Sequence, residues 1–128
     1  MPGLVFLVLC LLCSGDVAVS HDELKNVAYG KYAFQSSECG VPGYSGSKAV
    51  NGLFTDLAHS GAEKTPFLVI DLGKNYVIQE IEVFARKRWE RIAMWCTVDT
   101  VGRYVKIQIT SGVSNVLTPA EVLVWGHL

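Results

Sequence analysis

The sequence is poor in the residues and motifs that carry catalysis. It has three histidines, and two of them, His21 and His127, lie at the ends of the region that we predict below to be the mature domain, so no histidine cluster has metal-ligand spacing. It contains no G-x-S-x-G nucleophile elbow, no H-E-x-x-H pair, no P-loop and no dinucleotide fingerprint. Its carboxylates are scattered and do not form an obvious acid and base pair of a glycosidase. We therefore expect a protein that is not an enzyme.

Long helical periodicity, internal repeats and linkers are also absent. Short runs of β-forming residues are separated by Gly, Asn, Ser and Pro, which favours a sandwich or barrel. In one run Ile81 and Val83 share a face while Glu82 and Phe84 share the other, as in a half-buried antiparallel strand. The expected strands are 31–37, 67–72, 76–86, 103–110 and 121–125, with a turn at 73–75 and long loops over 40–61 that include a helical turn at 48–51. The pattern predicts an all-β domain.

The N-terminus carries an apolar run, Leu4–Leu12, that no Lys or Arg precedes. This run is too short to span a bilayer as a helix, and its position fits the apolar core of a secretory signal peptide. The small residues Ala18 and Ser20 suit a cleavage site before His21, with a cut after Gly15 as the alternative. The competing interpretation is a short membrane anchor. We predict a signal peptide and hence a secreted, extracellular protein.

Removal of the leader, residues 1–20, would leave residues 21–128 with balanced charge. The full chain has 12 acidic and 11 basic residues, and the leader contains one acid, Asp16, and no base. The mature domain is therefore formally neutral, so its overall charge demands neither a nucleic acid nor a membrane as a partner. Its length suits one domain with one modest core.

Two of the four cysteines, Cys39 and Cys96, would remain after cleavage. In an oxidising compartment they are most simply one disulfide, and we expect that pairing. The alternative is two unpaired thiols whose original partners are missing.

Arg86–Arg91 is the most concentrated polar feature, with four cations and one aromatic residue in six positions. One interpretation is a solvated loop whose charge Glu90 partly balances. Another is a polar ligand site, because guanidinium groups donate to pairs of ring hydroxyls and the Trp89 indole offers an apolar face to a sugar. A nucleic-acid or heparin patch is a third interpretation, which the neutral total charge weakens.

Several ordered blocks of the sequence resemble the F-type lectin (fucolectin) family. The blocks are Asn26-Val27-Ala28, Gln35-Ser36-Ser37, Lys48-Ala49-Val50-Asn51-Gly52, 65–73 (TPFLVIDLG), 101–107 (VGRYVKI) and 120–124 (AEVLV), so the match covers about 26–126. An ordered set of blocks is more specific than any single motif. The resemblance implies a jelly-roll β-sandwich, as in discoidin and the coagulation-factor C domains, that binds terminal L-fucose on glycans.

The family's sugar motif is a His, twenty-six residues, Arg-x-Asp, four residues, and then Arg or Lys. In this chain His59 is followed after twenty-six residues by Arg86, and Glu90-Arg91-Ile92 resembles the end of the motif after a two-residue shortening. The resemblance implies that His59, Arg86 and Arg91 donate hydrogen bonds to the axial 4-hydroxyl and neighbouring oxygens of fucose.

The chain departs from this motif at two positions. Arg88 stands where the family has the Asp that helps to orient the arginines, and Glu90 is the residue that could replace this acceptor. The family's adjacent cysteine pair, which gives the sugar an apolar contact, is absent, and Trp89 is its expected replacement as a stacking face. A carboxylate replaced by Arg removes an acceptor and adds a repelling cation.

The resemblance also implies a calcium site, with ligands from the loop around Asn51, from a Glu that corresponds to Glu121, and from backbone carbonyls such as that of Lys48. Asn51 stands where an Asp is usual, and Leu53 where an Asn is usual, which removes one charge and one ligand. Because calcium takes six or more oxygens, we expect a degraded site.

The chain also lacks an internal segment of the family after residue 92. Family members have a longer stretch between the positions of Ile92 and Cys96, including strands of the sandwich, where this chain has only three residues. Cys96 corresponds to a cysteine whose usual partner lies in that stretch. A sandwich without this segment exposes strand edges and loses core area.

Two functional hypotheses follow. The first is a secreted, non-enzymatic lectin for fucosylated glycans that serves recognition of microbes or self glycans, with weak binding per sugar and a possible homo-oligomer. The second is a discoidin-like domain that has lost the sugar site and binds a protein or an acidic surface through Arg86–Arg91. Neither involves nucleic acid or membrane insertion.

Overall fold

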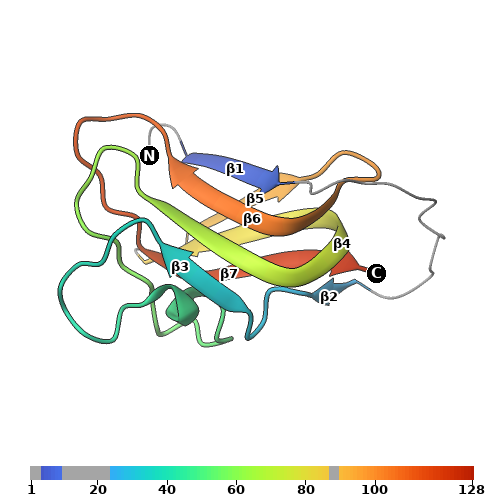
Figure 1. The fold of residues 1–128 in the computed structure, drawn as a ribbon, viewed down its shortest axis with the longest axis horizontal. Helices are drawn as coiled ribbons and strands as arrows, with labels where there is room; N and C mark the ends of the chain where they lie inside the picture. Colours follow the sequence, from blue (N-terminus) through green and yellow to red (C-terminus); the bar gives the residue numbers. More distant parts are fainter. Residues whose placement is uncertain (1–3, 10–23, 87–89) are drawn as a thin grey trace.

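A computed structural model describes residues 4–9, 24–86 and 90–128, and it confirms the all-β prediction (Figure 1). One 3-10 turn, η1 (Gly46–Ala49), is described beside the strands. The seven strands are β1 (Leu4–Leu9), β2 (Lys25–Asn26), β3 (Tyr32–Gln35), β4 (Phe67–Ala85), β5 (Arg91–Trp95), β6 (Val101–Ile109) and β7 (Pro119–His127). No helix among these residues is long and apolar enough to cross a membrane.

Strand β4 is a single bent strand that belongs to both layers of the sandwich (Figure 1). Two strands separated by a turn at 73–75 were predicted for this region, and the bend is at that turn. Gly73 has a φ of 87°, a backbone conformation that residues with a side chain rarely adopt, and the register with β6 shifts between Asp71 and Tyr76. The bend lets one strand turn the corner between the layers.

Each half of β4 has a strand on both sides. The first half pairs with β3 through Ala33↔Ile70 and with β6 through Ile70↔Val105, and β1 extends this layer beyond β6. The second half pairs with β5 through Val83↔Ile92 and with β7 through Val83↔Val122, and β2 extends that layer beyond β7. All of these pairings are antiparallel.

The core lies between the layers, and the predicted inward positions Ile81 and Val83 belong to it. Its largest members come from β4, β6 and β7, and they are Leu68, Ile70, Leu72, Ile78, Ile81, Val105, Ile107, Val122 and Val124. A register shift between Ile78 and Glu80 turns both Ile78 and Ile81 inward although they are three residues apart. Burial of these side chains supplies the main stabilisation of the fold.

The two ends of the sandwich differ (Figure 1). At one end, which we call the loop end, the chain 36–66, the β4–β5 connection and the chain 110–118 gather. At the opposite end, which we call the bend end, lie the bend of β4, the turn 97–100 and the last residues of β7.

Strand β1 comes from the segment predicted to be the apolar core of a signal peptide. It pairs with the outer edge of β6 from Leu4↔Ile109 to Leu9↔Tyr104. Cleavage before His21 stays a prediction, and it would leave this edge of β6 without its partner strand.

The predicted disulfide between Cys39 and Cys96 is wrong, since both are free thiols in the structure. Cys39 lies in the chain that follows β3 at the loop end, where its thiol contacts the carbonyl oxygen of Val41. Cys96 follows β5 toward the bend end, where its backbone N–H donates to Gln79 and its side chain packs against the core. The two cysteines therefore lie at different ends of the sandwich, and burial raises the pKa of the Cys96 thiol.

Candidate functional site at the loop end

Backbone hydrogen bonds bring His59 and Arg86 to the same end of the sandwich. Ala85, the last residue of β4, is paired with Pro119 of β7, and the carbonyl oxygen of Pro119 accepts a hydrogen bond from the N–H of Ala58 at 3.0 Å. His59 and Arg86 directly follow Ala58 and Ala85. The backbone of β7 at Pro119 thus ties both segments to the loop end, with Ala85 and Ala58 each joined to it.

The imidazole of His59 is held by its own loop. Its Nδ1 lies 2.7 Å from the carbonyl oxygen of Ser60, its backbone N–H donates to the carbonyl of Tyr44, and its ring lies 5.9 Å from the Tyr44 ring. A carbonyl oxygen can only accept, so Nδ1 carries the proton. In the neutral imidazole, Nε2 is therefore an acceptor, whereas the sequence analysis expected His59 to donate.

Arg86 is exposed at the start of the β4–β5 connection. The connection is closed by a hydrogen bond of 2.8 Å from the N–H of Ala85 to the carbonyl of Glu90. Trp89 and Arg88, the predicted stacking face and the residue at the family's Asp position, lie outside the described residues. Of the cations of this cluster that are described, Arg86 and Arg91 are both exposed, and no ion pair of Arg86 is seen among the described residues.

Arg91 lies on β5, opposite Phe84. Its Nη2 donates to Glu80 at 3.0 Å and its Nε donates to Glu82, which also accepts from the indole N–H of Trp125. These carboxylates raise the pKa of Arg91, chiefly through the hydrogen bond to Glu82. Glu80 pairs with Trp95, which lies at the other end of β5 from Arg91. The Arg91 guanidinium therefore extends along β5 on the outer face of the β5–β4–β7 layer.

His59 and Arg86 thus lie at the same end of the sandwich, and Arg91 has two partners, Glu82 and Glu80, that were not predicted. Glu90 was the expected acceptor for the arginines, but Glu82 and Glu80 fill that role for Arg91. Strand β5 was not predicted, because its five residues directly follow a cluster of charged residues. Without this strand the contact between Arg91 and Glu82 could not be deduced. The strand alternation that placed Glu82 on the outer face was the available signal.

Glu121 is buried on the outer face of β7, where a strand-edge carboxylate would ordinarily be solvated. The loop after η1 covers it, and the backbone N–H of Gly52 donates to its Oε2 at 2.7 Å. Edge-to-face packing of Phe54 on Phe84, with ring centroids 4.9 Å apart, fixes this loop on the sheet. Burial raises the pKa of Glu121 to about 7, although the N–H groups of Gly52 and Asn51 oppose the shift.

Most of the side chains around the predicted calcium site are engaged by protein groups. Among the described residues Oε1 of Glu121 is buried without a hydrogen-bond partner, but its other oxygen already accepts from Gly52. The Asn51 amide donates to Asp56 at 2.8 Å and accepts from the N–H of Leu53, and the Lys48 ammonium lies 3.8 Å from Asp56. Residues 24–86 and 90–128 contain no group of three or more His, Cys, Asp or Glu side chains placed to hold a metal ion. Because calcium takes six or more oxygens, these side chains alone do not complete a site, and calcium binding stays a prediction.

Comparison with known proteins identifies the architecture. No protein-family model matches this sequence, and no curated protein sequence does. Solved structures match its fold. The lectin domain of lectinolysin, complexed with Lewis B antigen, has a TM-score of 0.70 at 21% identity, over 80% of this chain and 97% of that one.

Two further structures agree. The F-lectin (fucolectin) from the serum of striped bass, Morone saxatilis, has a TM-score of 0.69 at 20% identity, over 82% of this chain and 50% of that one. A fucose-binding module of Streptococcus pneumoniae, SpX-3, has a TM-score of 0.69 at 18% identity, over 82% of this chain and all of that one. The resemblance to F-type lectins that the sequence shows is thus confirmed as a shared β-sandwich fold, one that resembles carbohydrate-binding lectin domains.

Proposed function

We propose that this protein is a secreted, non-catalytic lectin that recognises terminal L-fucose on glycans at its loop end. The observation that supports the proposal is that His59 and Arg86, which have the spacing of the family's sugar motif, follow two residues that are both joined to Pro119 at the loop end. Structures of the same fold include a fucose-binding module and a lectin domain complexed with Lewis B antigen, which supports a carbohydrate ligand.

The two side chains have complementary roles toward a sugar. Nε2 of His59 accepts a hydrogen bond from one ring hydroxyl, because Nδ1 is committed to Ser60. The exposed Arg86 guanidinium donates to two adjacent oxygens with its forked N–H groups. A hydroxyl that both donates to imidazole and accepts from guanidinium is held in one orientation, which selects among sugar stereoisomers.

Arg91 acts as the second arginine of the site. Its Nε donates a hydrogen bond to Glu82 and its Nη2 donates one to Glu80, so the N–H groups of Nη1 remain to donate to a sugar oxygen. The carboxylates fix the guanidinium in the way that the family's Asp does according to the sequence resemblance. Arg91 is therefore a positioning and donor group at the margin of the site, and Trp89 is proposed as the stacking face.

A glycan array with the full-length sequence expressed as a secreted protein tests the proposal. We expect fucose-selective binding that Arg86→Ala and His59→Ala each abolish and that added calcium or a chelator leaves unchanged. Lys74→Ala, which removes an exposed cation at the bend end, is the matched control and retains binding. Binding to fucosylated and non-fucosylated glycans alike would overturn the proposal.

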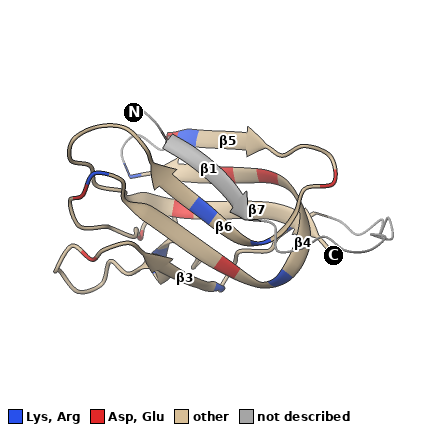
Figure 2. Cartoon of the chain, turned by 45° about the horizontal axis from the view of Figure 1, so that its top comes forward, with Lys and Arg blue, Asp and Glu red and all other residues tan. Residues whose placement is uncertain are grey.

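A second candidate function, docking to an acidic surface through the β4–β5 connection, is favoured by the exposed Arg86. Figure 2 shows that, on the described strands, Lys and Arg are interspersed with Asp and Glu, and this view of the described residues has no broad basic face. The array separates the two functions, because purely ionic binding fades with salt and ignores fucose.

A further inference from the structure

The bend end of the sandwich holds a cavity that has no part in the proposed fucose site. Its volume is about 310 Å³, and the residues around it come from β2 and the turn after it, the bend of β4 and the end of β7. This volume is at the lower end of the range for small-molecule sites. Two lysines, Lys25 and Lys31, and the apolar or aromatic residues Val27, Tyr29 and Tyr76 are among those that line it.

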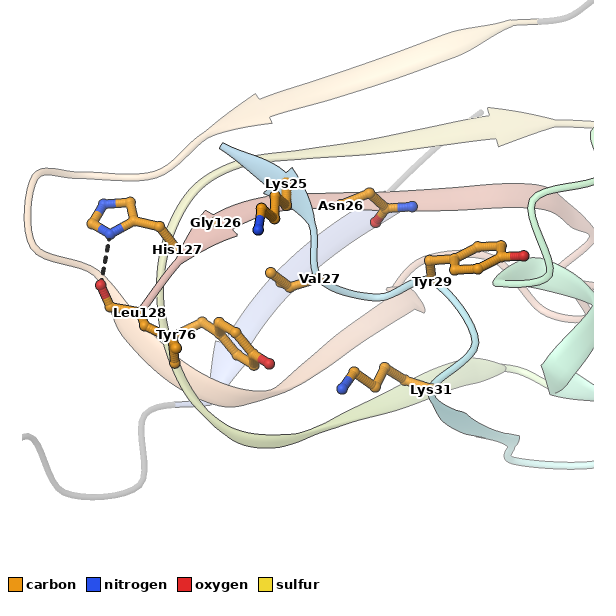
Figure 3. Close-up of a pocket in the computed structure, with 9 residues that line it drawn as sticks. All are labelled: Lys25, Asn26, Val27, Tyr29, Lys31, Tyr76, Gly126, His127 and Leu128. Carbon is orange, nitrogen blue, oxygen red and sulfur yellow. Dashed lines mark hydrogen bonds between the residues drawn. The ribbon is translucent and has the colours of Figure 1, made fainter. Parts of the chain in front are cut away.

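Apolar and aromatic surface forms the interior of this cavity (Figure 3). Val27 lies at its centre and is buried, as is Tyr76, whose hydroxyl points toward Lys31. Tyr29 stands at the margin with 63% of its surface exposed. The His127 ring points away, and its Nδ1 lies 2.9 Å from an oxygen of the terminal carboxylate of Leu128, which also lines the cavity. The cavity thus offers ring faces against which a cyclic molecule can pack.

Two ammonium groups reach the cavity from different elements, Lys25 from β2 and Lys31 from the residue before β3 (Figure 3). None of the lining residues is an Asp or Glu. Asp71 feels the charge of Lys31, but it is already engaged by Arg103 through bonds of 2.8 and 3.0 Å. Lys74, whose ammonium lies 5.6 Å from the centre of the Tyr76 ring, adds positive potential. In the described part of the chain, no ion pair occupies Lys25 or Lys31.

We propose that this cavity binds an acidic sugar residue, one that carries a carboxylate or a sulfate on a pyranose ring. The ammonium groups of Lys25 and Lys31 pair with the anionic group, and the ring packs on Tyr76 and Val27. A neutral sugar cannot form the charge-assisted hydrogen bonds with the lysines, and an inorganic anion cannot form the ring contacts. The protein would then bind two glycan groups at opposite ends, a fucose at the loop end and an acidic sugar at the bend end.

Titration of the full-length secreted protein with methyl β-D-glucuronide, followed by NMR chemical shifts, tests this site. The matched ligand control is methyl β-D-glucoside, which has the same ring without the charge, and a glucoside 6-sulfate shows which acid is preferred. We expect the glucuronide or the sulfate ester to bind at least tenfold more tightly than the glucoside, with shifts at Val27 and Tyr76. Equal affinity for the neutral glucoside, or no binding of either acidic sugar, would overturn the proposal.

Variants locate the site. The double variant Lys25→Ala/Lys31→Ala is expected to lose at least tenfold in affinity for the acidic sugar. The matched control for this double variant is Lys64→Ala/Arg86→Ala, which removes two charges at the loop end. It is expected to bind the acidic sugar as wild type does and to lose binding of fucose. Circular dichroism confirms that each variant is folded, and Lys25→Arg/Lys31→Arg is expected to retain binding. Acidic-sugar binding that survives the Lys25/Lys31 alanine variant would overturn the assignment, whatever the outcome for fucose.

Discussion

Arg103 of β6 forms a bidentate ion pair with Asp71 of β4, in which Nε lies 2.8 Å from Oδ1 and Nη2 lies 3.0 Å from Oδ2. The pair joins neighbouring strands just before the bend of β4, where the register is about to shift, and Arg103 also lies 5.1 Å from the centre of the Tyr104 ring. Asp71 in addition accepts from the N–H of Gly73, the glycine of the bend. The ion pair thus stabilises the corner at which β4 passes from one layer to the other.

Arg103→Ala is therefore expected to lower the midpoint of urea unfolding at pH 7. The hydrogen bond from Arg103 holds the pKa of Asp71 below its ordinary value of 3.8, so this stabilisation is present above pH 3.8 and is lost as the pH falls through the lowered pKa. The difference in urea midpoint between wild type and Arg103→Ala should accordingly become smaller at acidic pH. Both groups are partly solvated, so we expect a small effect. Lys64→Ala serves as the control, and an unchanged midpoint for Arg103→Ala at pH 7 would contradict the prediction.

The buried carboxyl of Glu121 predicts an opposite pH dependence. Its pKa is raised by burial from 4.5 to about 7, so between these values the native state holds a proton that the unfolded chain has released. Stability should therefore fall as the pH rises from 4.5 to 7, by on the order of 3 kcal/mol. Glu121→Gln keeps the shape and an acceptor for Gly52, so we expect it to flatten this slope and to be more stable than wild type at pH 8.

Urea unfolding at several pH values, followed by tryptophan fluorescence, measures the Glu121 effect. Glu90→Gln, at an exposed carboxylate in the β4–β5 connection, is the control and should keep the slope of wild type. A slope that persists in Glu121→Gln would assign the pH dependence to another group.

The sequence predicted the fold where strand alternation was strong and failed where tertiary contacts decide. The alternation in β4, β6 and β7 identified the inward residues, such as Ile81, Val105 and Val122, because half-buried strands impose a period of two. The same rule places Glu121 outside, and its burial follows from a loop about seventy residues earlier in the chain that folds over β7. No local pattern reveals such a cover.

The candidate site was predictable in part for the same reason. Spacing and family resemblance located His59 and Arg86, and the backbone network through Pro119 brings both to the loop end. The partners of Arg91 depend on the pairing of β5 with β4, which no alternation of apolar and polar residues in the sequence predicted. Likewise, the expected disulfide rested on the number of remaining cysteines, and a count carries no information about which end of the sandwich each one occupies.

The N-terminal segment leads to a prediction about assembly. We expect N-terminal sequencing of the secreted protein to begin at His21, which removes β1 and leaves the edge of β6 from Tyr104 to Ile109 unpaired. An open strand edge is a template for pairing with another chain, so the mature protein should self-associate as its concentration rises. Light scattering on a size-exclusion column measures this. A secreted chain that retains Leu4–Leu9, or a cleaved chain that stays monomeric, would contradict one or both steps.

The free thiols can be counted. Chemical titration of the denatured, non-reduced mature protein is expected to give two thiols per chain, since Cys39 and Cys96 lie at different ends of the sandwich. In the native protein Cys96 should react slowly, because burial raises its pKa and lowers the fraction of reactive thiolate. Cys39→Ser leaves the slow thiol alone and identifies it. Titration of fewer than two thiols would show that a disulfide forms in the mature protein.

Arg91 separates a role in binding from a role in stability. Its guanidinium is held by Glu82 and Glu80, so Arg91→Ala removes a sugar donor and also leaves the nearly buried Glu82 with only the Trp125 indole as a partner. We expect this variant to weaken fucose binding severalfold, less than the complete loss in Arg86→Ala, and to lower the urea midpoint, which Arg86→Ala should leave unchanged. Glu82→Gln keeps an acceptor for both Arg91 and Trp125, so it should preserve most of the stability while loosening the guanidinium and weakening binding. If Arg91→Ala lowers stability and leaves fucose affinity unchanged, Arg91 belongs to the sheet surface alone and the sugar site consists of His59 and Arg86 without it.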